Sequence, residues 1–193
     1  MFRRLYDWMM KMAKHRKAVW ALSLVSFAES SFFPLPPDIM LIPMVLAKRA
    51  KAFVYATFAT ISSVLGGIAG YAIGYFLFDA IGKPVLDFYG YGGKFSTFAA
   101  QYNEWGAWIV LMAGLTPFPY KVITIASGVT GLSFITFMVA SIVARSIRFF
   151  AVCGLLYWFG AQIRSFIEKY FGLVTLIFFI SLFGGFLLVK YLF

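Results

Sequence analysis

The chain has 193 residues, of which 62% are hydrophobic, 21% aromatic and only 12% charged. A water-soluble domain of this size has no use for so much apolar surface, so the composition predicts a polytopic membrane protein. The net charge of +10 comes mostly from lysines and arginines beside apolar segments. Positive-inside bias and anionic lipid headgroups explain that charge better than nucleic acid binding does.

Residues able to carry enzyme chemistry are scarce. Cys153 is the single cysteine and His15 the single histidine, so the sequence offers neither a disulfide framework nor metal-ligand spacing. It contains no nucleophile elbow, no His–carboxylate cluster and no cofactor fingerprint. We therefore expect a protein that is not an enzyme and that uses no cofactor and no metal.

Residues 1–17 have apolar side chains at helical spacing, with most basic side chains off that stripe. This pattern predicts an amphipathic helix on the cytoplasmic surface, acting as an anchor without a recognition role. The apolar stripe consists of Phe2, Leu5, Tyr6, Met9, Met12 and Ala13.

The next segment, residues 19–47, is apolar and interrupted, and basic clusters flank it on both sides. Each cluster prefers the cytoplasmic face, so a single crossing would carry one of them to the wrong side. Its arms, Val19–Phe33 and Asp38–Ala47, would reach only about 22 Å and about 15 Å as helices, short of the ~30 Å apolar core. We therefore predict a re-entrant hairpin, broken by prolines that stop the helix. These prolines are Pro34, Pro36 and Pro37.

A full span is predicted over Phe53–Phe78, with Gly66, Gly70 and Gly74 on one face. Small residues at this interval let another backbone approach closely in lipid, so we expect tight helix packing here. Residues 79–105 are more polar and are predicted to form a connector on the outer face, a surface helix with loops.

Residues 107–131 repeat the interrupted pattern, with Pro117 and Pro119 at the break and Lys121 just after it. A long span is predicted over Ser133–Gly160, followed by a cytoplasmic connection. A last span over Gly172–Val189 would leave the C-terminus periplasmic, opposite a cytoplasmic N-terminus.

The two breaks share a pattern, Pro-x-Pro-x-charge, at PLPPD (34–38) and PFPYK (117–121). One full span separates the two units, so the second unit should enter the membrane from the opposite face. Paired, proline-interrupted apolar segments in two inverted halves indicate a transporter binding site. Irregular backbone at membrane depth also requires protein or a water-filled cavity around it.

Five charged side chains fall within these halves. A charge at the membrane centre costs at least ~2.5–3.5 kcal/mol, so these groups should face a cavity, a partner or each other. Arginine donors and a lysine suit a phosphate group, and burial can favour the protonated form of a carboxylate, allowing proton exchange. Alternatively, the charges only form ion pairs between the halves, or the arginines lie near a span end and snorkel. The five are Glu29, Asp38, Lys121, Arg145 and Arg148.

The predicted fold is thus an all-α polytopic membrane protein with two inverted units, each a re-entrant helical hairpin followed by a transmembrane helix. It forms a single membrane domain over residues 1–193. Its parts are the surface helix (1–17), the first hairpin and span (18–78), the connector (79–105), the second hairpin and span (106–160), and a connector with the last span (161–193).

Four stretches resemble the DedA family of membrane proteins, which carry the VTT or SNARE-associated domain, and are closest to its short bacterial YqaA-type branch. They are FAESSFFPLPPDIMLIP (27–43), GGIAGYAIGYFLF (66–78), LTPFPYKVITIASGVTGLSF (115–134) and RSIRFF (145–150). The resemblance implies two facing re-entrant hairpins, a bacterial inner-membrane location, and movement of phospholipids or a polyprenyl phosphate with suspected proton coupling.

The family's acidic pair falls on Glu29 and Asp38. Its second hairpin usually has arginines three residues before and three after a proline, where this chain has Gly114 and Tyr120, with Lys121 beside the latter. Either Lys121 takes over with Arg145 and Arg148, or the substrate differs.

The expected function is therefore a transporter or flippase-like or scramblase-like protein for an anionic lipid, with membrane lipids and protons as partners and a homo-oligomer conceivable. Two alternatives stay open: a small-ion or proton-coupled cation transporter, and a scaffold protein that transports nothing.

Overall fold

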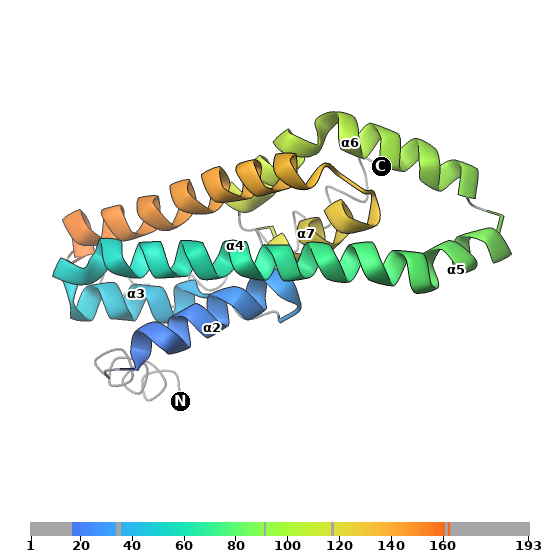
Figure 1. Ribbon diagram of the computed structural model, residues 1–193. Helices are drawn as coiled ribbons and strands as arrows, with labels where there is room; N and C mark the ends of the chain where they lie inside the picture. The colour runs from blue at the N-terminus through green and yellow to red at the C-terminus, as the bar shows by residue number, and fades with distance from the viewer. Residues whose placement is uncertain (1–16, 34–35, 91, 117, 161, 163–193) are drawn as a thin grey trace.

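The computed structural model describes residues 17–33, 36–90, 92–116, 118–160 and 162 (Figure 1). Over this part the chain is helical and contains no strand, which confirms the all-α class there. Two helices, Arg49–Phe88 and Phe134–Gly160, are long and apolar enough to cross a membrane. The predicted last span lies outside the described residues, as does the predicted surface helix except for Lys17.

Both of these long helices expose apolar side chains along their length, as helices in contact with lipid do. On the first they include Phe58, Ile61 and Leu65, and on the second Ile135, Val139, Val143 and Leu155.

Helices α2 (Ala18–Ser31) and α3 (Asp38–Ala47) lie along one half of α4 (Ala52–Leu77) (Figure 1). Two contacts show that α2 runs parallel to α4. The Ser26 hydroxyl donates to the Ala59 carbonyl, and the Ser30 hydroxyl bonds the Ser63 hydroxyl, each partner lying 33 positions later in the sequence. Helix α3 then returns to the start of α4, which it reaches through the short 3-10 turn Arg49–Lys51. The chain therefore reverses between α2 and α3.

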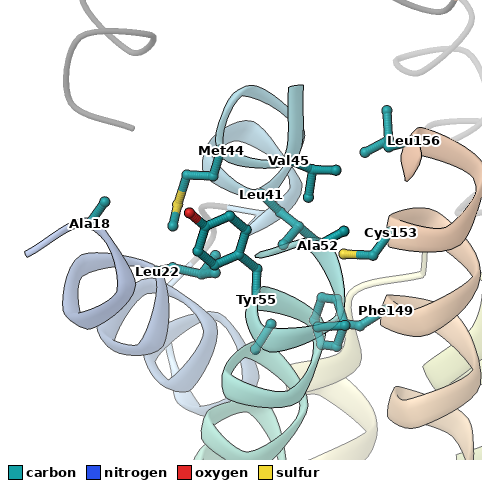
Figure 2. Close-up of a cluster of buried hydrophobic side chains, with 12 residues drawn as sticks. Ala18, Leu22, Leu41, Met44, Val45, Ala52, Tyr55, Phe149, Cys153 and Leu156 are labelled. Carbon is teal, nitrogen blue, oxygen red and sulfur yellow. The ribbon is translucent and has the colours of Figure 1, made fainter. Parts of the chain in front are cut away.

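An apolar core joins these three helices to the end of the Phe134–Gly160 helix. Figure 2 shows Leu22, Leu41, Tyr55, Phe149 and Cys153 pointing toward one another from the four helices. All five are buried, so this core fixes the first hairpin against both long helices.

The predicted connector over 79–105 differs from what the structure shows. Helix α4 continues through a π-helical turn (Phe78–Gly82) into α5 (Lys83–Phe88), and α6 runs without a break from Gly92 to Leu115. The polar half of α6 and the apolar half predicted as a hairpin arm are therefore one helix. The reason is local: between Gly93 and Pro117 nothing stops a helix, and Ala, Gln and Glu favour one.

Helix α7 (Tyr120–Val129) packs antiparallel to α6. The Tyr102 hydroxyl, in the first half of α6, lies 3.0 Å from the Ser127 hydroxyl near the end of α7. The Asn103 side-chain amide donates to the Thr130 carbonyl over 2.9 Å. After a turn at Gly131, which has a positive φ of 67°, the Phe134–Gly160 helix runs antiparallel to α4. Its first residue, Phe134, contacts Tyr71, and its distal Tyr157 contacts Phe53 at the start of α4.

Helices α2 and α7 pack against the glycine face of α4. A Cβ on Gly66 would overlap the Phe27 carbonyl of α2, one on Gly70 the Thr124 hydroxyl, and one on Gly74 the Ile125 carbonyl of α7. The prediction of tight helix packing at these glycines is therefore confirmed. The insertion of the two chain reversals into a bilayer, and an inverted repeat relating them, stay predictions.

Candidate functional site

The helices are interrupted beside the prolines that the sequence analysis singled out. Helix α2 ends at Ser31 and α3 begins at Asp38, directly after Pro37; α6 ends at Leu115 and α7 begins after Pro119. A proline has no amide hydrogen to continue a preceding helix but fits the start of a new one. Pro34 and Pro117 lie outside the described residues.

The acidic residues lie on either side of the first break. Glu29 is in the last turn of α2, and Asp38 is the first residue of α3, where a helix N-terminus favours a negative charge. The break thus brings two carboxylates from separate helices to the side of α4 that faces Arg145 and Arg148.

Arg145 forms an ion pair with Glu29 across 116 residues of sequence, with 3.0 Å between Nη2 and Oε2. Its Nε donates to Ser63 on α4. The Ser63 hydroxyl lies 2.7 Å from the Ser30 hydroxyl, which donates to Glu29 over 3.2 Å. Arginine, two serines and the carboxylate therefore close a ring of hydrogen bonds between three helices.

Two aromatic rings enclose the same guanidinium group. The Tyr120 and Phe149 rings each have their centroid 4.7 Å from the Arg145 Cζ, and Arg145 is fully buried. Tyr120 is itself held by a 2.5 Å hydrogen bond to Ser141. Cation–π contact and the ion pair together fix the orientation of this guanidinium group.

The second ion pair lies one helical turn further along. Arg148 Nη2 approaches Asp38 Oδ2 to 2.6 Å, a charge-assisted hydrogen bond. Both side chains keep some exposure, 16% and 24%, whereas Arg145 has none. The outer pair can therefore exchange partners with solvent or a ligand more easily than the inner pair.

Lys121 is in the first turn of α7, where its carbonyl accepts a hydrogen bond from Thr124 over 2.9 Å. Within the described residues its amino group belongs to neither ion pair. The structure thus joins four of the five predicted site residues as two pairs and keeps the lysine apart. The part that any of the five plays in binding stays a prediction.

Several residues of this cluster were not identified from the sequence: Ser30, Ser63, Tyr120, Thr124 and Phe149. The Thr124 hydroxyl shares its one hydrogen between the Lys121 carbonyl and the Ser30 carbonyl, which lies 3.0 Å away, and so connects the second hairpin to the first. The usable signal was hydroxyl residues within otherwise apolar helices, which need a partner in lipid. In the part of the chain described, no three His, Cys, Asp or Glu side chains lie together as metal ligands.

Comparison with known proteins shows the family of this chain. The VTT domain family model matches residues 35–158, which include four of the five charged site residues, all but Glu29. An uncharacterized protein of Haemophilus influenzae is 41% identical over 171 residues, 86% of this chain and 88% of the relative. An uncharacterized protein of Histophilus somni is 39% identical over 171 residues, 86% of this chain and 89% of the relative. No solved structure matches. The chain belongs to the VTT-domain, or DedA, family of membrane proteins.

Proposed function

We propose that this protein moves an anionic lipid, a phospholipid or a polyprenyl phosphate, across the bacterial inner membrane as a transporter or a flippase-like or scramblase-like protein. The observation that carries the proposal is the pair of ion pairs, Glu29–Arg145 and Asp38–Arg148, beside the helix breaks. Membership in a family of transporter-like membrane proteins supports the same class of function.

The charges favour an anionic substrate. Arginine presents a planar set of N–H donors that fits a phosphate in bidentate fashion, and Lys121 adds a positive charge outside the ion pairs. A headgroup phosphate competing for Arg148 would release Asp38, which would then exchange a proton or close the site again. In this scheme Arg145, in contact with two aromatic rings, keeps its place while the outer pair opens.

The course of the helices supports a central binding site. Chain reversal between α2 and α3, and again between α6 and α7, lets both hairpins return to the face from which they entered (Figure 1). In the proposed arrangement the two reversals face each other within the bilayer, which keeps their irregular backbone away from lipid. The N-terminus then lies on the cytoplasmic side.

Lipid movement in vesicles tests the proposal. We expect purified protein in vesicles to move a fluorescent anionic phospholipid between leaflets, and Asp38→Asn and Glu29→Gln to lose most of that rate. Glu104→Gln is the matched control, because Glu104 is an exposed carboxylate on α6. Wild-type rates in both variants of the ion pairs would contradict the proposal.

One observation favours a competing function. Because both carboxylates already have an arginine partner, the ion pairs could simply hold the helices of a scaffold protein together. Exchanging the charges, Asp38→Arg with Arg148→Asp, distinguishes the two. If the pair is purely structural, the protein keeps its function when the pair is reversed. A lipid transporter instead loses the position of its phosphate-binding cation, and lipid movement does not recover. Movement of small cations without lipid would instead favour an ion transporter.

A further inference from the structure

Among the described residues, each ion pair has one buried atom without a hydrogen-bond partner, Arg145 Nη1 in the inner pair and Asp38 Oδ1 in the outer, and the Thr60 hydroxyl of α4 is unpartnered too. Arg145 is fully buried and Thr60 is only 8% exposed. Buried polar atoms are nearly always hydrogen-bonded, to protein or to ordered water.

Thr60 is unusual for a helical threonine. Thr57 on the same helix and Thr130 both donate to the carbonyl four residues earlier, each over 2.9 Å, whereas Thr60 does not. Its hydroxyl is therefore not used by the backbone of its own helix and is available to another group.

The course of the helices brings Thr60 to the height of the outer ion pair. Helix α4 and the Phe134–Gly160 helix are antiparallel, and Ser63 bonds Arg145 between them. The residue three positions before Ser63 is therefore level with the residue three positions after Arg145. These two residues are Thr60 and Arg148, and Arg148 holds Asp38. Thr60 therefore lies on α4 at about the height of the Asp38–Arg148 pair, one helical turn from the contact between Ser63 and Arg145.

We propose that a water molecule bridges the two ion pairs at this point. It accepts a hydrogen bond from Arg145 Nη1, donates one to Asp38 Oδ1, and shares a third with the Thr60 hydroxyl. The ligand must both accept and donate, since Arg145 offers only a hydrogen and Asp38 only a lone pair. A metal cation and a lipid tail each fail this requirement, whereas water with three polar partners meets it.

The bridge would join Asp38 to the ring of Glu29, Ser30, Ser63 and Arg145, making one hydrogen-bonded network of both pairs. A proton could then enter at the partly exposed Asp38 and be relayed by the water. This consequence rests on the proposed function, but the water site itself does not depend on it.

An experimental structure at a resolution that shows ordered waters is the direct test. We expect density within hydrogen-bond distance of Asp38, Arg145 and Thr60 in the wild-type protein and in Thr60→Ser, and its loss or displacement in Thr60→Val. A direct Asp38–Arg145 hydrogen bond in place of that density would overturn the proposal.

Thermal unfolding in detergent tests the part of Thr60 separately. Thr60→Val should lower the Tm, and Thr60→Ser should keep it near the wild-type value. Thr57→Val, which removes an exposed hydroxyl one turn earlier, is the control and should change the Tm little. Equal effects of the two valine variants would exclude Thr60 as a partner of the water. If the water is present but Asp38→Asn moves lipid normally, the proposed function fails and the water site stands.

Discussion

Arg145 shows how a single side chain can be charged and still lie among apolar helices. Its guanidinium group has an ion pair to Glu29, a hydrogen bond to Ser63 and contacts with two aromatic rings. Desolvation of two charges consumes much of their attraction, so the pair adds little net stability compared with apolar residues of similar size. Removing one partner is different, because the other charge then stays buried alone.

This asymmetry makes a prediction about stability. Arg145→Met should lower the free energy of unfolding by about 3–5 kcal/mol, since it leaves the Glu29 carboxylate unpaired. The double variant, Arg145→Met with Glu29→Met, should recover a large part of that loss. Equilibrium unfolding in detergent measures both, and a double variant that is less stable than the single one would contradict this account of the pair.

Lys121 is expected to separate binding from stability. Because its amino group belongs to neither ion pair, Lys121→Gln should leave the Tm nearly unchanged. Its charge is nonetheless available to a headgroup, so the same variant should slow movement of an anionic phospholipid more than that of a zwitterionic one. Lys121→Arg serves as the control and should preserve the preference. A uniform slowing of both lipids would count against a role in headgroup recognition.

At the scale of the helices, contact in lipid depends on small residues that let backbones approach. The face of α4 that carries Gly66, Gly70 and Gly74 provides that approach to α2 and α7 in turn. Gly128 of α7 does the same from the other side, where a Cβ would overlap the Tyr71 carbonyl of α4. Both hairpins are therefore positioned by one helix.

Two glycines of α4 form a matched pair for testing this packing. Gly74→Ala should destabilise the protein by about 1–3 kcal/mol, because the new methyl group meets the backbone of Ile125, which cannot move alone. Gly67→Ala should be tolerated, because its methyl group would lie at ordinary contact distance, 3.5 Å, from Thr124 and Phe137. Unfolding of the two variants under identical conditions gives the comparison. Equal losses would show that helix propensity, and not close approach, governs this face.

Helix breaks and helix faces could be predicted from the sequence because both depend on local chemistry. The predicted arm over Asp38–Ala47 has the bounds of α3, and the predicted second span agrees with the Phe134–Gly160 helix within a residue. The first span is predicted to begin within a residue of α4, but the helix continues past its predicted end at Phe78 to Phe88. The continuous α6 was missed, because the polarity of residues 79–105 suggested loops where the structure has helix from Gly92 to Leu115.

Which arginine pairs with which carboxylate could not be predicted from the sequence. Sequence spacing places Arg145 and Arg148 on one helix face, but which carboxylate each one meets depends on how α2 and α3 pack against α4. Ser63 was missed for the same reason, since its role comes from facing Ser30 and Arg145 at once. These contacts join residues more than 30 positions apart, and periodicity carries no information about them.

The whole molecule is expected to place two helical hairpins in the membrane from opposite sides. For the first hairpin, the ends at Lys17 and Lys48 should then lie on the same, cytoplasmic face, since each end carries a basic cluster. For the second, Gly93 and Ser133 should both lie on the outer face. All four residues are exposed, so cysteines placed there are open to reagents.

A labelling experiment decides between this arrangement and straight crossings. With Cys153→Ser as background, Lys17→Cys and Lys48→Cys should react with a membrane-impermeant thiol reagent only from the cytoplasmic side. Gly93→Cys and Ser133→Cys should react only from the outside. If α2 and α3 together crossed the bilayer once, Lys17 and Lys48 would react from opposite sides. That result would also separate the ion pairs from the bilayer centre and remove the geometric basis for a lipid path between the hairpins.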